Sequence, residues 1–250
     1  MKPLVSVVMP ARNSERYIEE AMASVFSQSH RDWELIVVDD GSTDGTGDVV
    51  QMVLAREPRL RMLRLAHPGG PAGARNAAIA LAEGRYIAFL DSDDLWLPAK
   101  LERQLELMER TKAPLSFTAY RKIDSEGNPG RAVIEVPSTV TYAELLKTNV
   151  IGCLTAVYDA LALGKRYMPQ AGHEDYGLWL AILGDPVVAV GINEPLACYR
   201  VHDRSVSRNK LRAAGMQWAV YRGVARLSFW QSLYYFLHYV YHGLKKFRLR

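Results

Sequence analysis

Cysteine is scarce in this 250-residue chain, which contains only Cys153 and Cys198. The two lie far apart, without a CxxC pair and without a histidine at ligand spacing. This pattern favours buried free thiols over a disulfide or a zinc site, and a reducing compartment fits it.

Long apolar runs are also missing at the N-terminus. MKPLVSVVMPARN holds an apolar run of six residues before Pro10, too short for a signal peptide or a membrane span. We therefore expect a cytoplasmic protein. Because 49% of its residues are hydrophobic, the chain can bury a core as one large domain or as two lobes that share a sheet.

Several ligand-binding motifs are absent or incomplete. No G-x-G-x-x-G follows the first expected strand and G-x-x-x-x-G-K-[ST] occurs nowhere, which excludes the ordinary dinucleotide and Walker-type sites. Asp91, Asp93 and Glu102 match three positions of a calcium loop, but its glycine is missing and Pro98 interrupts it. An EF-hand is therefore disfavoured, as is a DxDx(T/V) phosphatase motif, because Leu95 replaces its last residue.

Acidic residues are nearly absent from the C-terminus. Residues 200–250 contain eleven Lys or Arg and one acid, Asp203, so they carry +10 and leave −6 on the rest of a chain whose net charge is +4. A basic tail on an acidic body predicts that the tail contacts something anionic.

The first half alternates β-branched apolar runs with helical patterns, which predicts an α/β fold with a mostly parallel sheet. We expect strands at 4–9, 33–40, 61–65 and 85–91. Helices are expected around 18–26 and 49–54, in the alanine-rich segment that ends at Gly84, and from Pro98 to Met108.

The pattern changes after about residue 113. A hairpin is expected around SEGNPG, followed by a short helix that starts with a capping box of Thr141 and Glu144. A strand at 154–158, a helix in HEDYGLWLAIL and two strand pieces, VVAVGI and LACYRV, complete the body. One mixed sheet spanning both halves is the simplest architecture.

Functional side chains follow three of the expected strands. Pro10 to Asn13 end the first, Asp39 and Asp40 the second, and Asp91 to Asp94 the fourth. Ligands of open α/β sheets bind beyond the carboxyl ends of strands. Carboxylates there can hold a ribose, a base or a hard cation such as Mg²⁺ or Mn²⁺. A nucleotidyltransferase would also use such a cluster, and a non-catalytic nucleotide-sugar-binding protein remains a second alternative.

Five segments, VSVVMPARN, WELIVVDDGSTDGT, GPAGARNAAI, YIAFLDSDDLW and HEDYGLWL, occur in the order and spacing found in family 2 glycosyltransferases. Over roughly residues 4–205 the chain resembles that family, which implies the GT-A fold: a central mixed, mostly parallel sheet flanked by helices. FLDSDDLWLPAKLERQ, TYAELLKTN and YRVHDRSVSRNK are similar to bacterial enzymes of teichuronic-acid and related surface-polysaccharide assembly.

The resemblance also implies a division of the chain. Residues 1–113 would bind the nucleotide-sugar, 114–205 would form the acceptor-binding half of the same domain, and 206–250 would form a helical tail. The residues implied to bind the nucleotide-sugar are Pro10, Asn13, Glu15, Asp39, Arg75 and Asp91. Asp39 would contact the base, Arg75 would lie near the nucleotide, and Asp91 would face ribose or metal-bound water.

The implied metal, Mn²⁺ or Mg²⁺, is bound by Asp93 and neutralises the charge that develops on the departing diphosphate. His202 would complete the metal site or contact phosphate; the alternative is a surface-loop histidine. Arg200 is expected to meet phosphate or only solvent. Asp94 lies ahead of a helix and is expected to cap it.

Asp175, in the ED pair of HEDYGLWL, is implied to be the general base of an inverting transfer, with Glu174 supporting it or facing the acceptor. Its alternative role is that of an acid at a helix N-terminus. Trp96 and Trp179 are expected to be packing residues; the alternative is that either stacks on an acceptor sugar.

The tail LSFWQSLYYFLHYVYHGLKKFRLR is amphipathic and too short and too polar to span a membrane. The residues predicted on its apolar face are Phe229, Leu233, Phe236, Leu237, Val240, Leu244 and Phe247. We expect an interfacial helix on anionic lipid; the alternative is packing on the body or across a homodimer. Nucleic acid is disfavoured because the aromatic residues form a continuous face.

The full expectation is a metal-dependent, inverting glycosyltransferase. It would move a sugar from a donor, UDP-linked by expectation, to a growing lipid-linked surface polysaccharide. It would act as a peripheral protein on the inner face of the cytoplasmic membrane.

Overall fold

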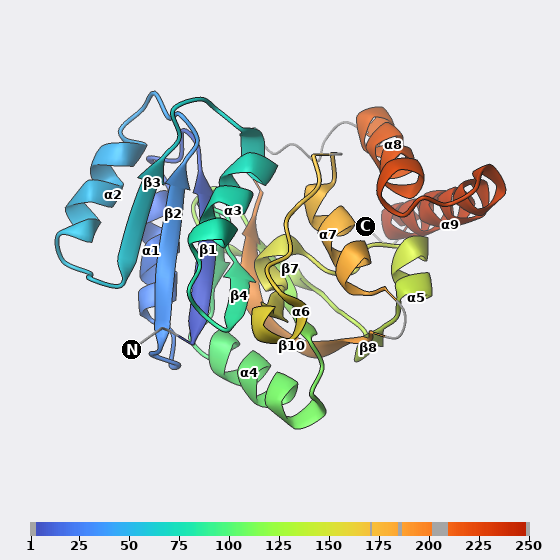
Figure 1. Ribbon diagram of the computed structural model, residues 1–250, viewed down its shortest axis with the longest axis horizontal. Coiled ribbons are helices and arrows are strands. Elements are labelled where there is room, and N and C mark those ends of the chain that lie inside the picture. Colours follow the sequence, from blue (N-terminus) through green and yellow to red (C-terminus); the bar gives the residue numbers. More distant parts are fainter. Residues whose placement is uncertain (1–3, 171, 185–186, 202–209, 249–250) are drawn as a thin grey trace.

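The computed structural model describes residues 4–170, 172–184, 187–201 and 210–248 (Figure 1). Its first half contains β1 (Val5–Ala11), α1 (Ile18–Phe26), β2 (Trp33–Asp39), α2 (Thr46–Leu54), β3 (Leu60–Arg64), α3 (Gly70–Leu81), β4 (Tyr86–Phe89), β5 (Leu95–Trp96) and α4 (Lys100–Thr111). The second half contains β6 (Leu115–Ile123), β7 (Pro129–Ile134), β8 (Thr139–Val140), α5 (Tyr142–Lys147), η1 (Cys153–Thr155), β9 (Val157–Asp159), α6 (Ala160–Leu163), α7 (Glu174–Ile182) and β10 (Ala189–Arg200). The tail contains α8 (Lys210–Ala219), the π-helical turn η3 (Val220–Val224) and α9 (Phe229–Arg248).

One mixed sheet runs through both halves of the described chain, in the order β3-β2-β1-β4-β9-β6-β10-β5, with β7 on β6 and β8 on β10. Strands β1 to β4 are parallel, whereas the short β5 is antiparallel to β10. Strand β9 is antiparallel to both β4 and β6, and so joins the halves. The carboxyl ends of β1, β2 and β4 therefore share one edge, which is the arrangement the sequence predicts.

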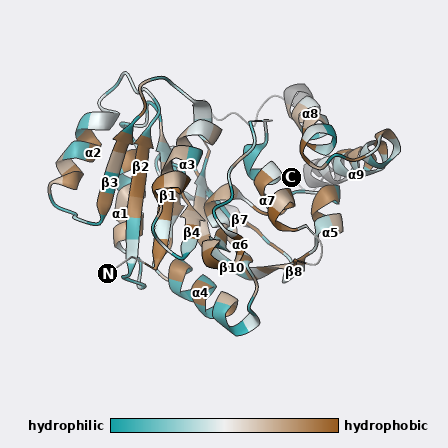
Figure 2. Ribbon diagram, in the orientation of Figure 1, coloured by the Kyte–Doolittle hydropathy of each residue, from teal (hydrophilic) through white to brown (hydrophobic). Residues whose placement is uncertain are grey.

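The alternation of side chains along the parallel strands builds a core on each face of the sheet. Val8 and Ile36 face one core with helix α3, whereas Val7 and Leu35 face the other with helix α1. Figure 2 shows these strands as mostly hydrophobic, as expected for a sheet covered on both faces. Helix α7 is buried from Tyr176 to Leu180, so it lies inside the body and is apolar almost all round.

Two local predictions need correction. Helix α3 ends at Leu81, so Gly84 is not its C-terminal glycine. Gly84 instead lies against β1, where an added Cβ would come 2.6 Å from the backbone nitrogen of Ser6. The two predicted strand pieces near the end of the body are one strand, β10, whose register shifts around Pro195, a residue that has no N–H for the ladder.

Other local predictions are confirmed. Thr141 and Glu144 form the capping box of α5, with the Glu144 N–H donating to the Thr141 hydroxyl and the Thr141 N–H to the Glu144 carboxylate. Trp96 and Trp179 are 2% and 0% exposed, and the Trp179 ring packs edge-on against Phe89 with 5.5 Å between centroids. Both tryptophans are therefore packing residues.

The tail helix α9 packs on the body along one side only. The Trp218 ring of α8 contacts the rings of Phe229 and Phe236 of α9, and Tyr235 and Phe236 pack against the core of the body. Ser232 of α9 is fully buried. On this side, α9 therefore packs on the body, as the alternative to lipid binding predicts.

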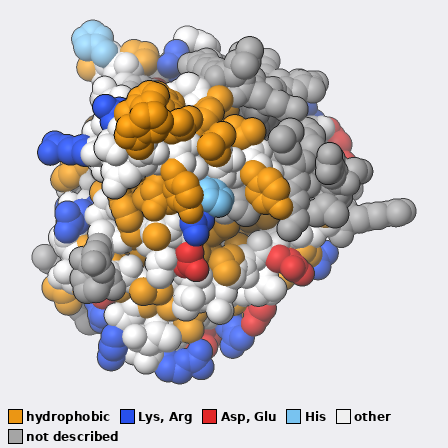
Figure 3. All heavy atoms as spheres, turned by 90° about the vertical axis from the view of Figure 1, so that its right-hand side faces the viewer, with side chains coloured by type: hydrophobic (Ala, Val, Ile, Leu, Met, Phe, Trp, Pro, Cys, Tyr) orange, Lys and Arg blue, Asp and Glu red, His pale blue; other side chains and the backbone are white. Residues whose placement is uncertain are grey.

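The other side of α9 is exposed and overlaps the predicted apolar face only in part, since Phe229, Leu237 and Val240 of that face are 54%, 62% and 40% exposed. Trp230, Tyr234, Leu237 and Tyr241 are 75%, 52%, 62% and 62% exposed. They repeat at intervals of four, three and four residues, so they form one stripe. Hydrophobic side chains gather on this end of the molecule (Figure 3). Within the described residues, none of the helices is long and apolar enough to cross a bilayer.

Candidate active site

Three loops meet at the carboxyl edge of the sheet, and Ser14 ties them together. The Ser14 N–H donates to the Thr46 hydroxyl after β2 at 2.8 Å. The Ser14 hydroxyl lies 2.7 Å from that of Ser92 after β4. The loops after β1, β2 and β4 are therefore one hydrogen-bonded unit.

The predicted residues of the first loop shape this edge. Asn13 adopts a left-handed backbone with φ of 51°, and its side-chain oxygen accepts the Thr43 N–H at 2.8 Å. The Glu15 carboxylate accepts the Gly45 N–H at 3.0 Å. Pro10 pairs with β2 inside the sheet. Asn13 and Glu15 thus lie against the turn between β2 and α2, whereas Pro10 lies beside Val38 of β2.

Asp39 and Asp40 have different partners. Asp39 is fully buried; its Oδ1 accepts the Ser42 N–H at 2.8 Å, and its Oδ2 lies 3.4 Å from Arg64 Nε. Among the described residues this Oδ2 has no hydrogen-bond donor. Asp40 accepts the N–H groups of Gly69 and Gly70 at 2.6 and 3.0 Å, and so stabilises the N-terminus of α3.

The three aspartates after β4 are also in separate environments. Asp91 and Asp93 are partly exposed at the edge, whereas Asp94 is buried. Burial, together with the charges of Asp93 and Asp91, raises the pKa of Asp94 well above its ordinary value. Its Oδ1 accepts the Arg200 N–H at 2.8 Å.

The prediction that Asp94 caps a helix is therefore wrong. Helix α4 begins at Lys100 after Ala99, and Asp94 bonds across the sheet to β10 instead. The prediction for Arg200 is also wrong. Its side chain is 1% exposed, pairs with Glu20 at 2.6 Å and donates to the Asp93 carbonyl at 2.8 Å, so it meets neither phosphate nor solvent.

A buried arginine joins the acidic loop to helix α7. Arg75 of α3 is 6% exposed; its Nη2 donates to Asp91 at 2.5 Å and its Nη1 to Glu174 at 2.9 Å. Asp175 follows in the first turn of α7. Burial raises the pKa of Asp175, and this rise is opposed by the charge of Arg75 and by the hydrogen bond from the Tyr176 N–H.

Both cysteines are free, as predicted, and both residues are half-buried. Cys153 lies beside this cluster, and burial raises the pKa of its thiol well above the ordinary value despite the charge of Arg75. Sequence reasoning assigned Cys153 no place near Asp175, because the two are distant in sequence. The capping role of Asp40 was also missed, although an acid at a strand end before a glycine-rich helix start signals it.

The structure supports the predicted metal site only in part. No group of three or more His, Cys, Asp or Glu placed to hold a metal occurs in the described part of the chain. Asp91 and Asp93 offer carboxylate oxygens at the edge, which are ligands of the kind that hard cations take. His202 lies outside the described residues.

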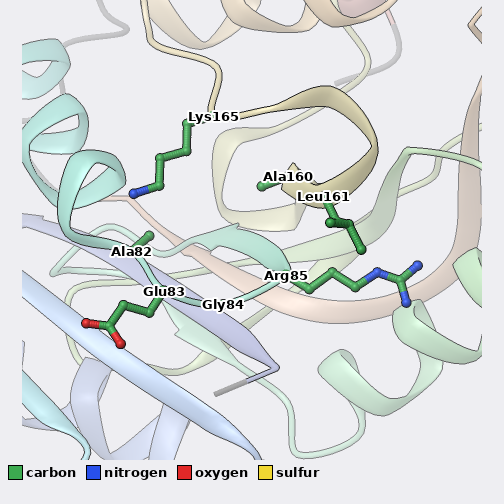
Figure 4. Close-up of a pocket in the computed structure, with 7 residues that line it drawn as sticks. All are labelled: Ala82, Glu83, Gly84, Arg85, Ala160, Leu161 and Lys165. Carbon is green, nitrogen blue, oxygen red and sulfur yellow. The ribbon is translucent and has the colours of Figure 1, made fainter. Parts of the chain in front are cut away.

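A hollow of about 740 Å³ lies at the opposite edge of the sheet, where β4 begins (Figure 4). The Lys165 Nζ donates to the Ala80 carbonyl at 2.7 Å. Arg85 bridges Asp159 and Glu109, at 2.8 Å to each. The cations of this hollow are thus held by the chain itself, and the predicted site residues lie elsewhere.

Comparisons with known proteins agree on the family. Residues 6–160 match the family model described as glycosyl transferase family 2. The chain is 43% identical over 246 residues to TuaG of Bacillus subtilis, a glycosyltransferase named for teichuronic acid biosynthesis, covering 98% of both chains. It is 38% identical over 245 residues to the Escherichia coli UDP-Glc:alpha-D-GlcNAc-diphosphoundecaprenol beta-1,3-glucosyltransferase WfgD, covering 97% of this chain and 94% of WfgD.

Solved structures agree on the fold. S. aureus TarS in complex with UDP-GlcNAc superposes with a TM-score of 0.70 at 21% identity, covering 93% of this chain and 69% of TarS. The mannosyltransferase PcManGT from Pyrobaculum calidifontis, solved with GDP-Man and Mn²⁺, gives a TM-score of 0.69 at 22% identity, covering 91% of this chain and 66% of its own. The expected GT-A fold, with helices added at the C-terminus, is confirmed.

The buried position of Arg200 predicts a structural effect of its removal. Arg200→Ala leaves Glu20 and the Asp93 carbonyl without their side-chain donor, and we expect it to lower the free energy of unfolding by about 3 kcal/mol. Arg16→Ala breaks an exposed ion pair with Glu126 and should cost less than about 1 kcal/mol. Urea unfolding measures both. If Arg200→Ala were as stable as the parent protein but bound the donor more weakly, the result would support the predicted contact between Arg200 and phosphate instead.

Proposed function

Because the chain belongs to glycosyltransferase family 2, we propose that it moves a sugar, with inversion, from a UDP-linked donor to a growing lipid-linked surface polysaccharide. Family membership makes the protein a glycosyltransferase and removes the nucleotidyltransferase and non-catalytic alternatives. The observation that carries the proposal is the Asp91–Arg75–Glu174 bridge, which brings the acidic edge and the start of α7 into one site.

The donor half in this proposal is 1–113. Oδ2 of Asp39 is a buried acceptor without a hydrogen-bond donor among the described residues, so an N–H group of a nucleobase would satisfy it. Uracil carries such an N–H. UDP as the carrier is also supported by the name of WfgD and by the TarS complex with UDP-GlcNAc.

A divalent cation fits the acidic edge. Asp93 would hold Mn²⁺ or Mg²⁺, Asp91 would meet ribose or a metal-bound water, and His202 stays a predicted further ligand. The bound ion would neutralise charge on the departing diphosphate. PcManGT, a protein of the same fold, was solved with Mn²⁺.

Asp175 is proposed as the base. Its carboxylate would take the proton of the acceptor hydroxyl while the hydroxyl oxygen forms the new bond to the anomeric carbon and the sugar–phosphate bond breaks. Attack opposite the leaving diphosphate inverts that carbon. Burial raises the pKa of Asp175, which strengthens it as a base, while Arg75 favours its ionised form.

The acceptor half in this proposal is 114–205, and the tail supplies the membrane contact. The stripe of Trp230, Tyr234, Leu237 and Tyr241 presents aromatic and aliphatic groups that suit the headgroup region of a bilayer. Residues 204–250 contain no acid, so anionic lipid would not be repelled. WfgD is named for an acceptor on diphosphoundecaprenol, a lipid, which supports work at the inner face of the membrane.

Removing the base should abolish transfer. We expect Asp175→Asn to lower kcat by roughly 10²- to 10⁴-fold with little change in donor binding, because the amide cannot accept the proton. Asp159→Asn is the matched control, since Asp159 caps helix α6 at the opposite edge of the sheet. Donor-transfer kinetics and nucleotide titration measure the two effects. Near-normal kcat in Asp175→Asn would remove it as the base.

The outer stripe of α9 should bind lipid. Trp230→Ser combined with Leu237→Ser should reduce flotation with phosphatidylglycerol-containing vesicles about tenfold or more, because two large apolar groups no longer enter the interface. Leu161→Ser, at a 77% exposed leucine in α6, is the control and should float as the parent protein does. Equal flotation of all three proteins would contradict the membrane role of α9.

A further inference from the structure

Helix α3 contacts both sides of the candidate site through one side chain. The Arg75 guanidinium uses Nη2 for Asp91, at the end of β4, and Nη1 for Glu174, in the first turn of α7. These carboxylates are separated by most of the second half of the chain. The planar fork of arginine suits two carboxylates at once, whereas a lysine ammonium is a point charge.

The next residue of α3 holds the segment before α7. The Asn76 Nδ2 donates to the Met168 carbonyl at 2.9 Å, and the Met168 N–H donates to the Asn76 Oδ1 at 2.7 Å. Arg75 and Asn76 thus bind the chain near Asp175 at two points, Glu174 and Met168. Met168 is 2% exposed and Asn76 is half-buried, so this contact is partly shielded from water.

Burying the charged guanidinium of Arg75 between Asp91 and Glu174 has a cost in free energy. Arg75 is buried, and its Nε has no acceptor among the described residues. Buried ion pairs often contribute less to stability than apolar residues of similar volume would. A charged arginine in this position is therefore better explained by what it orients than by the stability that it adds.

We propose that Arg75 is a positioning residue, which holds the helix carrying Asp175 at a fixed distance and angle from the acidic edge that receives the donor. The inference rests on the proposed function, because it takes Asp175 as the base. It differs from the nucleotide contact that the sequence implies for Arg75, since the two outer nitrogens of the guanidinium are already bonded to carboxylates.

The charges around Asp175 give the proposal a second readout. The groups that face Asp175 are Arg75 from α3, Cys153 from η1, and Glu174 and His173 from its own segment. Arg75 and His173 lower the pKa of Asp175, while Glu174 raises it. On the acid side of its pH profile, kcat falls as the base becomes protonated. The pH of this fall should therefore move in opposite directions when the charge of Arg75 and the charge of Glu174 are each removed.

The first test compares Arg75→Lys with the parent enzyme. Lysine keeps the charge but not the fork, and we expect kcat to fall about 10- to 100-fold, since a displacement of about 1 Å of a catalytic group has an effect of this size. The KM for the donor should change much less. Arg85→Lys is the matched control: Arg85 also bridges two carboxylates, Asp159 and Glu109, but at the opposite edge, so its kcat should not change.

The second test uses pH profiles of kcat. In Arg75→Ala the acid limb should move to higher pH, because the base loses a nearby cation, and added guanidinium should restore part of the rate. In Glu174→Gln the limb should move to lower pH, because a negative charge is removed while the amide oxygen can still accept from Nη1. Glu174→Gln changes no volume, so it keeps the test open if Arg75→Ala does not fold.

Three outcomes would overturn the inference. One is a raised donor KM at unchanged kcat in Arg75→Lys, which would make Arg75 a nucleotide contact. Another is a lower unfolding midpoint with unchanged kcat per folded molecule and unshifted pH profiles, which would make it a purely structural pair. The third is a shift of both acid limbs in the same direction. If Asp175→Asn retains activity, the proposed base fails instead, which separates the two failures.

Discussion

The constraint on which this structure depends is the crowding of carboxylates at one edge of its sheet. Asp39 and Asp40 lie at the end of β2, and Asp91, Asp93 and Asp94 follow β4, on the two sides of β1. Like charges close together disfavour one another's ionisation. Three of these carboxylates are stabilised by different partners. Asp40 takes backbone N–H groups at a helix start, Asp94 bonds to β10, and Asp91 meets a buried arginine.

The acids of this edge differ in how far they are exposed. The carboxylates of Asp40 and Asp94 are used within the fold, whereas Asp91, beside Arg75, and Asp93 are partly exposed. Oδ2 of Asp39 has no hydrogen-bond donor among the described residues. The proposed donor and cation therefore rely on a small part of the total charge. The remaining acids keep the loops in place, so the site can be preorganised before a substrate arrives.

Much of the fold was predictable from local patterns. The parallel strands, the hairpin of β6 and β7 and the capping box of α5 depend on residues close together in sequence. The convergence of the strand ends follows from parallel pairing alone. Predictions for Asp94 and Arg200 were wrong because both depend on a bond between β10 and the loop after β4, which no local pattern reveals.

The tail shows the same limit. Amphipathic periodicity predicted a helix but could not tell which side would meet the body, since aromatic residues lie on both sides of α9. The packing of Phe236 on Trp218 turns Trp230 and Tyr241 outward. Likewise, the GARN segment pointed to Arg75, but the link from Arg75 to Glu174 depends on the approach of two helices and has no signal in the sequence.

The central claim is an inverting transfer onto a lipid-linked acceptor at this edge of the sheet. It is tested most directly by incubating the full chain with Mn²⁺, a panel of UDP-sugars and a diphosphate-linked lipid carrying GlcNAc, followed by NMR of the purified product. The account predicts a glycosylated lipid whose new bond has the anomeric configuration opposite to that of the donor. A product with the donor's configuration, or release of free sugar without transfer, would contradict it.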